Sequence, residues 1–240
     1  SWVCLKEKEL EGMGKLLTQY NVVGIEDAAY LGMDYRQDYS KPGKAPFIPT
    51  IASLTENYFL IISSSKIFSY AGQRIAICVI SPGLMERRYP NLSQYYSTER
   101  AGHAFVHGGI YPTTAGVPQT PQYALAALFE AASSGKYQFL EEVRIYSRRA
   151  EKMKKVFLKY GIDLVYDEDL GQPIGDGFYF TVSHPGLNGE ELLFEMIRHG
   201  MAGIPLSTTG SKKEGVRICV SLIQDDQMDE LEKRLSSMEH

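Results

Sequence analysis

The chain has 240 residues, of which 44% are hydrophobic and 22% charged, so it can build one large domain, or one and a half, around a substantial core. Its net charge of −4 excludes the strongly basic surface with which proteins bind nucleic acids. The longest apolar runs are far shorter than the ~20 residues of a membrane-spanning helix, so we expect neither nucleic acid nor membrane as a partner.

The three cysteines, Cys4, Cys78 and Cys219, are odd in number, scattered and surrounded by apolar residues. This usage is typical of small core residues in a reducing compartment, not of a disulfide framework. We therefore expect a cytoplasmic protein.

The first predicted element is an amphipathic helix over residues 2–20, with Leu5, Leu10, Met13, Leu16 and Leu17 on its apolar side. A strand over residues 21–26 follows. A parallel α/β sheet does not open comfortably on a helix with no strand before it, and residue 1 is not methionine. We therefore expect a C-terminal fragment of a longer protein.

The next two predicted strands cover residues 58–62 and 74–81, and the segment between them carries Lys66 and Arg74, eight residues apart. A lysine amine is a nucleophile only when neutral, and a position at the end of an apolar strand favours the neutral form. The guanidinium fork of Arg74 matches a phosphate bidentately. The pair therefore indicates a binding site for a phosphorylated aldehyde.

Three spacings, Asp27-x-x-Tyr30, Ser63-x-x-Lys66 and Lys66-x7-Arg74, resemble in order and distance those of the pyridoxal-phosphate (PLP) enzymes of the class I/II aminotransferase family (fold type I). The resemblance implies that Lys66 forms the Schiff base with PLP and then moves the substrate's α-proton. It also implies that Asp27 pairs with the pyridine nitrogen, that Tyr30 donates to the phenolic oxygen, and that Ser63 and Arg74 hold the phosphate. Asp27, Tyr30 and Lys66 are thus the implied catalytic residues.

The region over residues 87–109 is polar and weakly patterned, and it contains His103 and His107, four residues apart. Such a pair could bind a metal if it lay on one face of a helix. Gly102, Gly108 and Gly109 argue against a helix, so we expect no metal site.

Predicted helices over residues 121–132 and 137–160 lead into a series of strands at 164–166 and 177–182, a helix at 189–199, a strand around Arg217 and a last helix at 225–235. The resemblance implies that Arg217 binds the α-carboxylate of the substrate.

By the same resemblance the fold class is α/β, with an incomplete three-layer large domain on a mostly parallel sheet and an α+β small domain at the C-terminus. We expect residues 1–135 to be the C-terminal part of the large, PLP-binding domain and residues 136–240 to be the small domain. The segment at 108–114 occupies the place where the family reaches a neighbouring active site, which implies a homodimer for the intact protein.

The implied function is amino transfer between an amino acid and a keto acid. A PLP-dependent lyase, decarboxylase or synthase of the same fold would share these residues, and so would the aminotransferase-like sensing domain of a transcription regulator. By comparison with the family, part of the cofactor-binding site is formed by residues that precede this chain. We therefore expect the fragment alone to bind PLP weakly or not at all, and to be inactive.

Overall fold

The computed structural model describes residues 4–36, 39, 41–175 and 177–238. The chain divides into two compact units. One comprises Leu5–Gly32 and Tyr39–Leu140 and is called the Lys66 unit; the other comprises Ser1–Cys4, Met33–Asp38 and Glu141–His240 and is called the Arg217 unit. These units are defined by contacts, and the domain ranges 1–135 and 136–240 stay a prediction.

The Lys66 unit combines a small sheet with short and long helices. Its strands are β1 (Gly24–Asp27), β2 (Tyr58–Ser63) and β3 (Ala76–Ile80). Its helices are α1 (Glu7–Gln19), α2 (Ser64–Ile67), α3 (Pro82–Glu86), α4 (Ala101–His103), the π-helix η4 (Ala104–Ile110), α5 (Tyr111–Thr114) and α6 (Gln119–Ser133), with 3-10 turns η1 (Ile51–Ser53), η2 (Ala71–Gln73) and η3 (Pro90–Gln94).

The sheet of this unit has the order β1-β2-β3 within the described residues, with β2 in the middle. The β1 and β2 strands are parallel, whereas β3 runs antiparallel to β2, with Ser63 opposite Ala76. The α/β fold class is confirmed, and the part of the sheet that this chain contributes is mixed. The connection between β2 and β3 has 12 residues, near the lower limit for the crossover that a parallel pair needs, and the antiparallel pairing avoids such a crossover.

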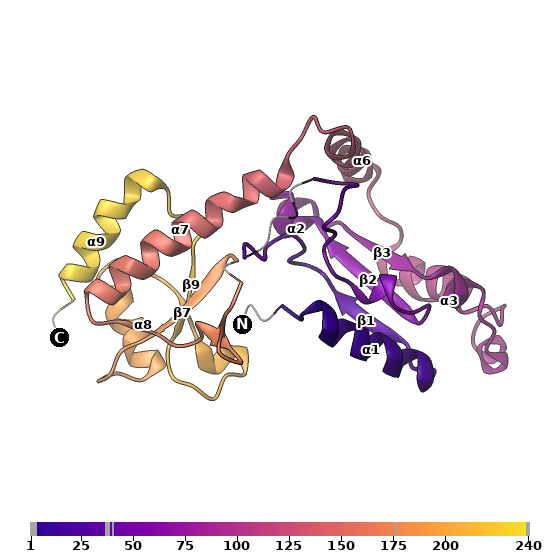
Figure 1. The fold of residues 1–240 in the computed structure, drawn as a ribbon, viewed down its shortest axis with the longest axis horizontal. Helices are drawn as coiled ribbons and strands as arrows, with labels where there is room; N and C mark the ends of the chain where they lie inside the picture. Colours follow the sequence, from indigo (N-terminus) through magenta and orange to yellow (C-terminus); the bar gives the residue numbers. More distant parts are fainter. Residues whose placement is uncertain (1–3, 37–38, 40, 176, 239–240) are drawn as a thin grey trace. The chain divides into compact units, whose positions relative to one another are not determined.

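Helical segments cover both faces of this sheet (Figure 1). On one face Leu10 and Leu17 of α1 pack with Ile51 and with Tyr58 and Leu60 of β2. On the other face the ring of Phe59 contacts that of Phe105 in η4, with centroids 4.7 Å apart. Because alternate residues of a strand point to opposite faces, these two contacts place the sheet between two layers.

The segment over residues 101–114 is helical, which corrects the expectation that its glycines exclude a helix. The glycines are sites of close packing. A Cβ on Gly102 would lie 2.0 Å from the Met85 sulfur, and one on Gly108 would lie 2.2 Å from the Tyr96 ring. Tertiary contacts here outweigh the low helix propensity of glycine, which costs about 1 kcal/mol per residue.

The Arg217 unit contains most of the long helix of the chain and a second sheet. Its strands are β4 (Asp163–Leu164), β5 (Glu168–Asp169), β6 (Gln172–Pro173), β7 (Tyr179–Ser183), β8 (Ile204–Pro205) and β9 (Val216–Cys219). Its helices are α8 (Gly189–Arg198) and α9 (Met228–Ser236), together with α7 (Phe139–Lys159), whose first two residues belong to the other unit, and the 3-10 turns η5 (Leu206–Thr209) and η6 (Asp225–Gln227).

The main sheet of this unit has the order β4-β7-β9-β8, and its pairings are antiparallel. Phe180 and Val182 of β7 and Val216 and Ile218 of β9 are buried on one face. The helices α7, α8 and α9 pack on that face and complete the core, in which Phe157 of α7 is 1% exposed. Arg217 alternates with these residues along β9, so it lies on the opposite face.

Most predicted elements are present with shifted ends. The predicted helix over 2–20 is observed as α1, which begins at Glu7, while Trp2 lies outside the described residues. Of its predicted apolar side only Leu10 is buried, and Leu5, Met13 and Leu16 are exposed. The weakly patterned region over 87–109 contains η3, α4 and η4.

The cysteines are only partly core residues, because Cys4 and Cys78 are half-buried and Cys219 is exposed. Burial, reinforced by the neighbouring Asp34 carboxylate, raises the pKa of Cys4 to about 11. Among the described residues, none of the helices has the length and apolar character needed to cross a bilayer.

Candidate functional site

Three of the predicted site residues lie at one edge of the β1-β2-β3 sheet. Asp27 and Ser63 end the parallel strands β1 and β2, so both are at the carboxyl edge. Since β3 is antiparallel, its first residue, Ala76, is opposite Ser63, and Arg74 just before it reaches the same edge. The topology therefore brings an acid, a hydroxyl and a guanidinium together.

Lys66 extends from the same edge on the short helix α2 that follows β2 directly. The hydroxyl of Ser63 caps this helix by accepting from the backbone N–H of Ser65 at 3.2 Å. The buried hydroxyl of Ser64 donates to the carbonyl of Ile75 at 2.6 Å. The cap by Ser63 and the hydrogen bond from Ser64 to Ile75, just before β3, fix the backbone that carries Lys66.

Apolar side chains fix the other end of this turn. Ile67 is 2% exposed and packs closely against Gly32. A Cβ added to Gly32 would lie 3.0 Å from the Ile67 side chain, and the backbone φ of Gly32 is +77°. The ring of Phe68 contacts the rings of Phe129 and Phe139, with centroids 5.4 and 5.2 Å away. Lys66 itself is half-buried, so its amine projects from a rigid support.

The amine of Lys66 lies over the ring of Tyr30, with Nζ 5.8 Å from the ring centroid. At this distance the ring quadrupole attracts an ammonium group. Tyr30 follows Asp27 by three residues, and the Asp27 carboxylate accepts from the N–H of Ala29 at 3.0 Å, which turns the chain after β1. This turn brings the phenol beside the lysine.

Arg74 has a left-handed backbone, with φ of +53°, and its Nη1 donates to the carbonyl of Ala71 at 2.8 Å. A non-glycine residue in this conformation is uncommon and is often associated with a functional turn. The side chain is exposed. A guanidinium has five N–H donors, so the bond to Ala71 orients Arg74 and leaves donors for an anion.

The donor set at this edge fits PLP. Lys66 would supply an amine for the aldehyde, Asp27 a carboxylate for the ring nitrogen, and Tyr30 a phenol for the ring oxygen. Arg74 and Ser63 would supply a charged and a neutral donor for the phosphate. Each polar part of the cofactor thus has a complementary group at one sheet edge.

Arg217 belongs to the other unit, on the face of β9 that the helices do not cover. Its guanidinium carbon lies 4.4 Å from the centroid of the Tyr179 ring. Its Nε is buried and has no hydrogen-bond partner among the described residues. Since a buried donor without an acceptor costs about 1–3 kcal/mol, this arrangement suits an anionic ligand such as a carboxylate.

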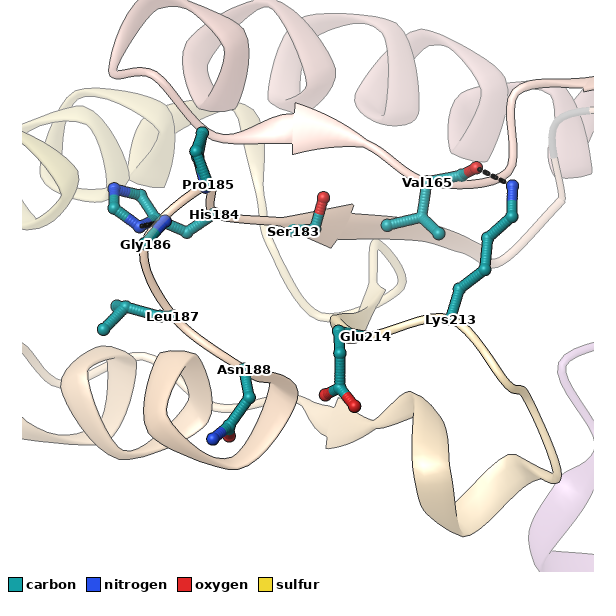
Figure 2. A pocket seen from close by; sticks show the side chains of 9 residues that line it. All are labelled: Val165, Ser183, His184, Pro185, Gly186, Leu187, Asn188, Lys213 and Glu214. Carbon is teal, nitrogen blue, oxygen red and sulfur yellow. Dashed lines mark hydrogen bonds between the residues drawn. The ribbon is translucent and has the colours of Figure 1, made fainter.

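A separate cavity of about 680 Å³ lies in the Arg217 unit between β7, the start of α8 and residues 213–214 (Figure 2). Its charged groups are engaged with the protein: Lys213 Nζ donates to the Val165 carbonyl at 3.3 Å, and the Glu214 carboxylate accepts from Gly189 N–H at 2.8 Å. None of the predicted site residues lines this cavity, and we assign it no role in the site.

Two supporting residues were not identified from the sequence. Ser64 holds the lysine turn, and the signal was a run of three serines between an apolar strand and the lysine. Tyr179 stacks on Arg217, and the signal was the alternation Phe178-Tyr179-Phe180, in which the tyrosine points to the face opposite Phe180.

Comparison with known proteins gives one family and a consistent fold. The family profile described as "Aminotransferase class I and II" matches residues 3–235. No curated protein matches the sequence. Among solved structures, the aromatic aminotransferase of Pyrococcus horikoshii OT3 is similar with a TM-score of 0.68 and 22% identity, over 97% of this chain and 55% of that one.

Two further solved structures agree. The methionine aminotransferase YbdL of Escherichia coli has a TM-score of 0.71 and 15% identity, over 98% of this chain and 55% of that one. An aspartate aminotransferase variant of Thermus thermophilus has a TM-score of 0.71 and 14% identity, over 100% of this chain and 57% of that one. These likenesses establish the fold, and the chain spans little more than half the length of each of them.

Proposed function

The chain belongs to the class I and II aminotransferase family, and from this premise we propose that the intact protein is a PLP-dependent aminotransferase that moves an amino group between an amino acid and a keto acid. The observation that carries the proposal is the meeting of Asp27, Ser63, Lys66 and Arg74 at one edge of the sheet. Each of these residue types is common alone. Their meeting at one edge supports a shared ligand.

The cofactor is held at four points in this proposal. Lys66 Nζ would hold the aldehyde carbon, Asp27 would pair with the pyridine nitrogen, and Tyr30 would donate to the ring oxygen. Arg74 and Ser63 would bind the phosphate through charge-assisted and neutral hydrogen bonds, and these bonds would retain the cofactor independently of Lys66. When bound, PLP supplies a ring that accepts the electron pair left on the substrate's α-carbon.

Lys66 has a second role in this proposal. Its amine would act as general base and general acid for the α-proton of the substrate. The rigid turn of Ser64, Ile67 and Phe68 favours this role, because proton transfer requires a donor–acceptor distance of about 2.6–3.2 Å.

Arg217 binds the substrate's α-carboxylate in the same proposal. The stacking on Tyr179 supports this role, and so does the buried Nε, which no described residue hydrogen-bonds. An arginine in that position orients a carboxylate through two parallel hydrogen bonds, which a lysine cannot reproduce.

The remaining assignments concern the intact protein. We propose a homodimer in the cytoplasm, with an amino acid and a keto acid as substrates. The composition supports this location through its free cysteines.

The test uses the intact protein loaded with PLP. Reduction with borohydride, digestion and peptide mapping should place the label on Lys66, and label on any other lysine would refute the site. The variant Lys66→Ala should lose the label and the activity, whereas Lys15→Ala, which removes an exposed lysine of α1, should keep both.

A second assay tests the reaction. The loaded protein should form a new amino acid only when a keto acid acceptor is present. Release of pyruvate and ammonia without an acceptor would instead indicate a lyase, and binding of PLP without turnover of any amino acid would indicate a sensing domain.

A further inference from the structure

The helical segment over residues 101–110 holds two histidines side by side on its exposed surface. His103 ends α4 and His107 lies in the π-helix η4, and the centroids of their rings are 4.4 Å apart with an angle of 43° between the ring planes. Both residues are exposed. Two histidines four residues apart on one helical face are a known arrangement for binding one metal ion.

The backbone beneath this pair is fixed by packing on the opposite side. Gly102 lies against Met85, Gly108 lies against the ring of Tyr96, and the ring of Phe105 contacts Phe59 of β2. Ala104 is 5% exposed. A rigid support lowers the entropy that the two imidazoles lose when both bind the same ion.

The ring separation matches a chelate. When each of two imidazole nitrogens lies about 2.1 Å from one ion and the two occupy neighbouring positions at about 90°, the ring centroids are about 4.5 Å apart. The observed 4.4 Å is close to this value. Angles near 90° between nitrogen ligands are typical of Cu²⁺ and Ni²⁺ in tetragonal geometry.

The number of protein ligands limits the kind of site. Among the described residues, no group of three or more histidine, cysteine or acidic side chains is arranged to hold a metal ion. An ion bound by His103 and His107 would therefore complete its coordination with water or with a ligand from another molecule. Hard cations such as Mg²⁺ and Ca²⁺ prefer oxygen ligands, so they do not suit this pair.

We propose that His103 and His107 form a two-histidine site for a divalent transition-metal ion, with Cu²⁺ and Ni²⁺ preferred over Mg²⁺ and Ca²⁺. The site lies on the outer side of η4. It is separate from the residues proposed to bind PLP and does not depend on the aminotransferase proposal. Its structural effect is to link α4 to η4 and to stabilise the helical state of this glycine-containing segment.

The test is a calorimetric titration of the full chain with NiCl₂, because Ni²⁺ is not reduced by the free thiols. We expect one strong site per chain. His103→Gln and His107→Gln should each weaken Ni²⁺ binding at least tenfold, since each leaves a single imidazole. A matched control is His199→Gln, in the Arg217 unit, whose ring contacts the Ser237 hydroxyl at 2.8 Å; it should leave binding unchanged.

Thermal unfolding of the metal-free proteins checks the fold of the variants. Because both histidines are exposed, their Tm values should match that of the unmodified chain, and only the unmodified chain and His199→Gln should gain stability from added NiCl₂. Absence of Ni²⁺ binding in the unmodified chain would overturn the proposal. So would binding that survives in both His103→Gln and His107→Gln.

Discussion

The guanidinium of Arg217 stacks on the ring of Tyr179, with its central carbon 4.4 Å from the ring centroid. The two residues come from the neighbouring strands β9 and β7, on the face opposite the helices. The stacking fixes the plane of the guanidinium, while its buried Nε has no hydrogen-bond partner in the part of the chain that the structure describes. A cation held in this way is prepared for a planar anion.

The first prediction follows from this pair. In the intact protein loaded with PLP, Arg217→Lys should lower kcat/KM for an amino acid substrate by about 10- to 100-fold. The reason is that the variant loses a charge-assisted bidentate contact, which contributes about 1.5–3 kcal/mol. Steady-state kinetics with substrates differing only in the carboxylate provide the measurement. If Arg217→Lys preferred an amino acid over its amide as strongly as the unmodified protein does, Arg217 would not be the residue that binds the carboxylate.

The second prediction contrasts two glycines of α1. A Cβ on Gly12 would meet nothing within 4 Å, whereas one on Gly14 would lie 2.7 Å from the Leu54 Cβ. Gly12→Ala should raise the free energy of unfolding by about 0.5–1 kcal/mol through helix propensity. Gly14→Ala should lower it by about 1–3 kcal/mol through overpacking. Urea unfolding of both variants tests the packing of α1, and equal effects would contradict it.

The third prediction concerns stability in acid. Burial raises the pKa of Asp34, but hydrogen bonds from Arg36, at 2.7–2.8 Å from its side chain, outweigh burial and hold the pKa below its ordinary value. The stabilisation is therefore present above the unfolded pKa of about 3.9 and is lost as the pH falls through the lower folded pKa. In Asp34→Asn, the unfolding free energy should depend less steeply on pH below about 4.

Measurements at high salt distinguish the contribution of Asp34 from that of exposed carboxylates. Four exposed carboxylates also have lowered pKa values, namely Glu151, Asp225, Glu230 and Glu232. Surface pairs are strongly screened at about 0.5–1 M salt. The difference between the unmodified chain and Asp34→Asn should persist under these conditions. A difference that disappears in salt would assign the effect to the surface instead.

The fourth prediction concerns Arg149 of α7, which is 7% exposed. Its Nη1 donates to the Ser221 carbonyl at 3.2 Å and its Nη2 to the Gln224 side chain at 2.5 Å, so one guanidinium holds the segment after β9. Arg149→Lys cannot reach both acceptors and should cost about 1–3 kcal/mol of unfolding free energy. Arg148→Lys, at the exposed neighbour, is the control and should change little. Faster amide exchange at 221–224 in Arg149→Lys alone would support the role.

The sequence predicted the elements whose pattern is local. The alternation in β7 and the apolar periodicity of α7 and α8 identified these elements, because burial of one face is encoded every two or three to four residues. Short elements such as α2 are too brief to show a period. The helical state of residues 101–110 depends on contacts of Gly102 with Met85 and of Gly108 with Tyr96. These are tertiary contacts, so a local sequence pattern does not reveal them.

The candidate site divides in the same way. The spacings of Asp27, Lys66 and Arg74 were visible in the sequence, and the sheet topology explains why the residues share an edge. The direction of β3 was not predictable from its apolar composition, since parallel and antiparallel core strands look alike. The roles of these residues in catalysis stay a prediction, to be tested on the intact protein.

The pairing of Ser63 with Ala76 has a consequence for how this protein can change. The residues between them carry both Lys66 and Arg74, and they also form the reverse connection between two hydrogen-bonded strands. Sliding β3 by a single residue would turn Ile77 and Val79 to the wrong side of the sheet. A change that shifted this register would thus be opposed by folding itself, independently of any chemistry that Lys66 and Arg74 perform.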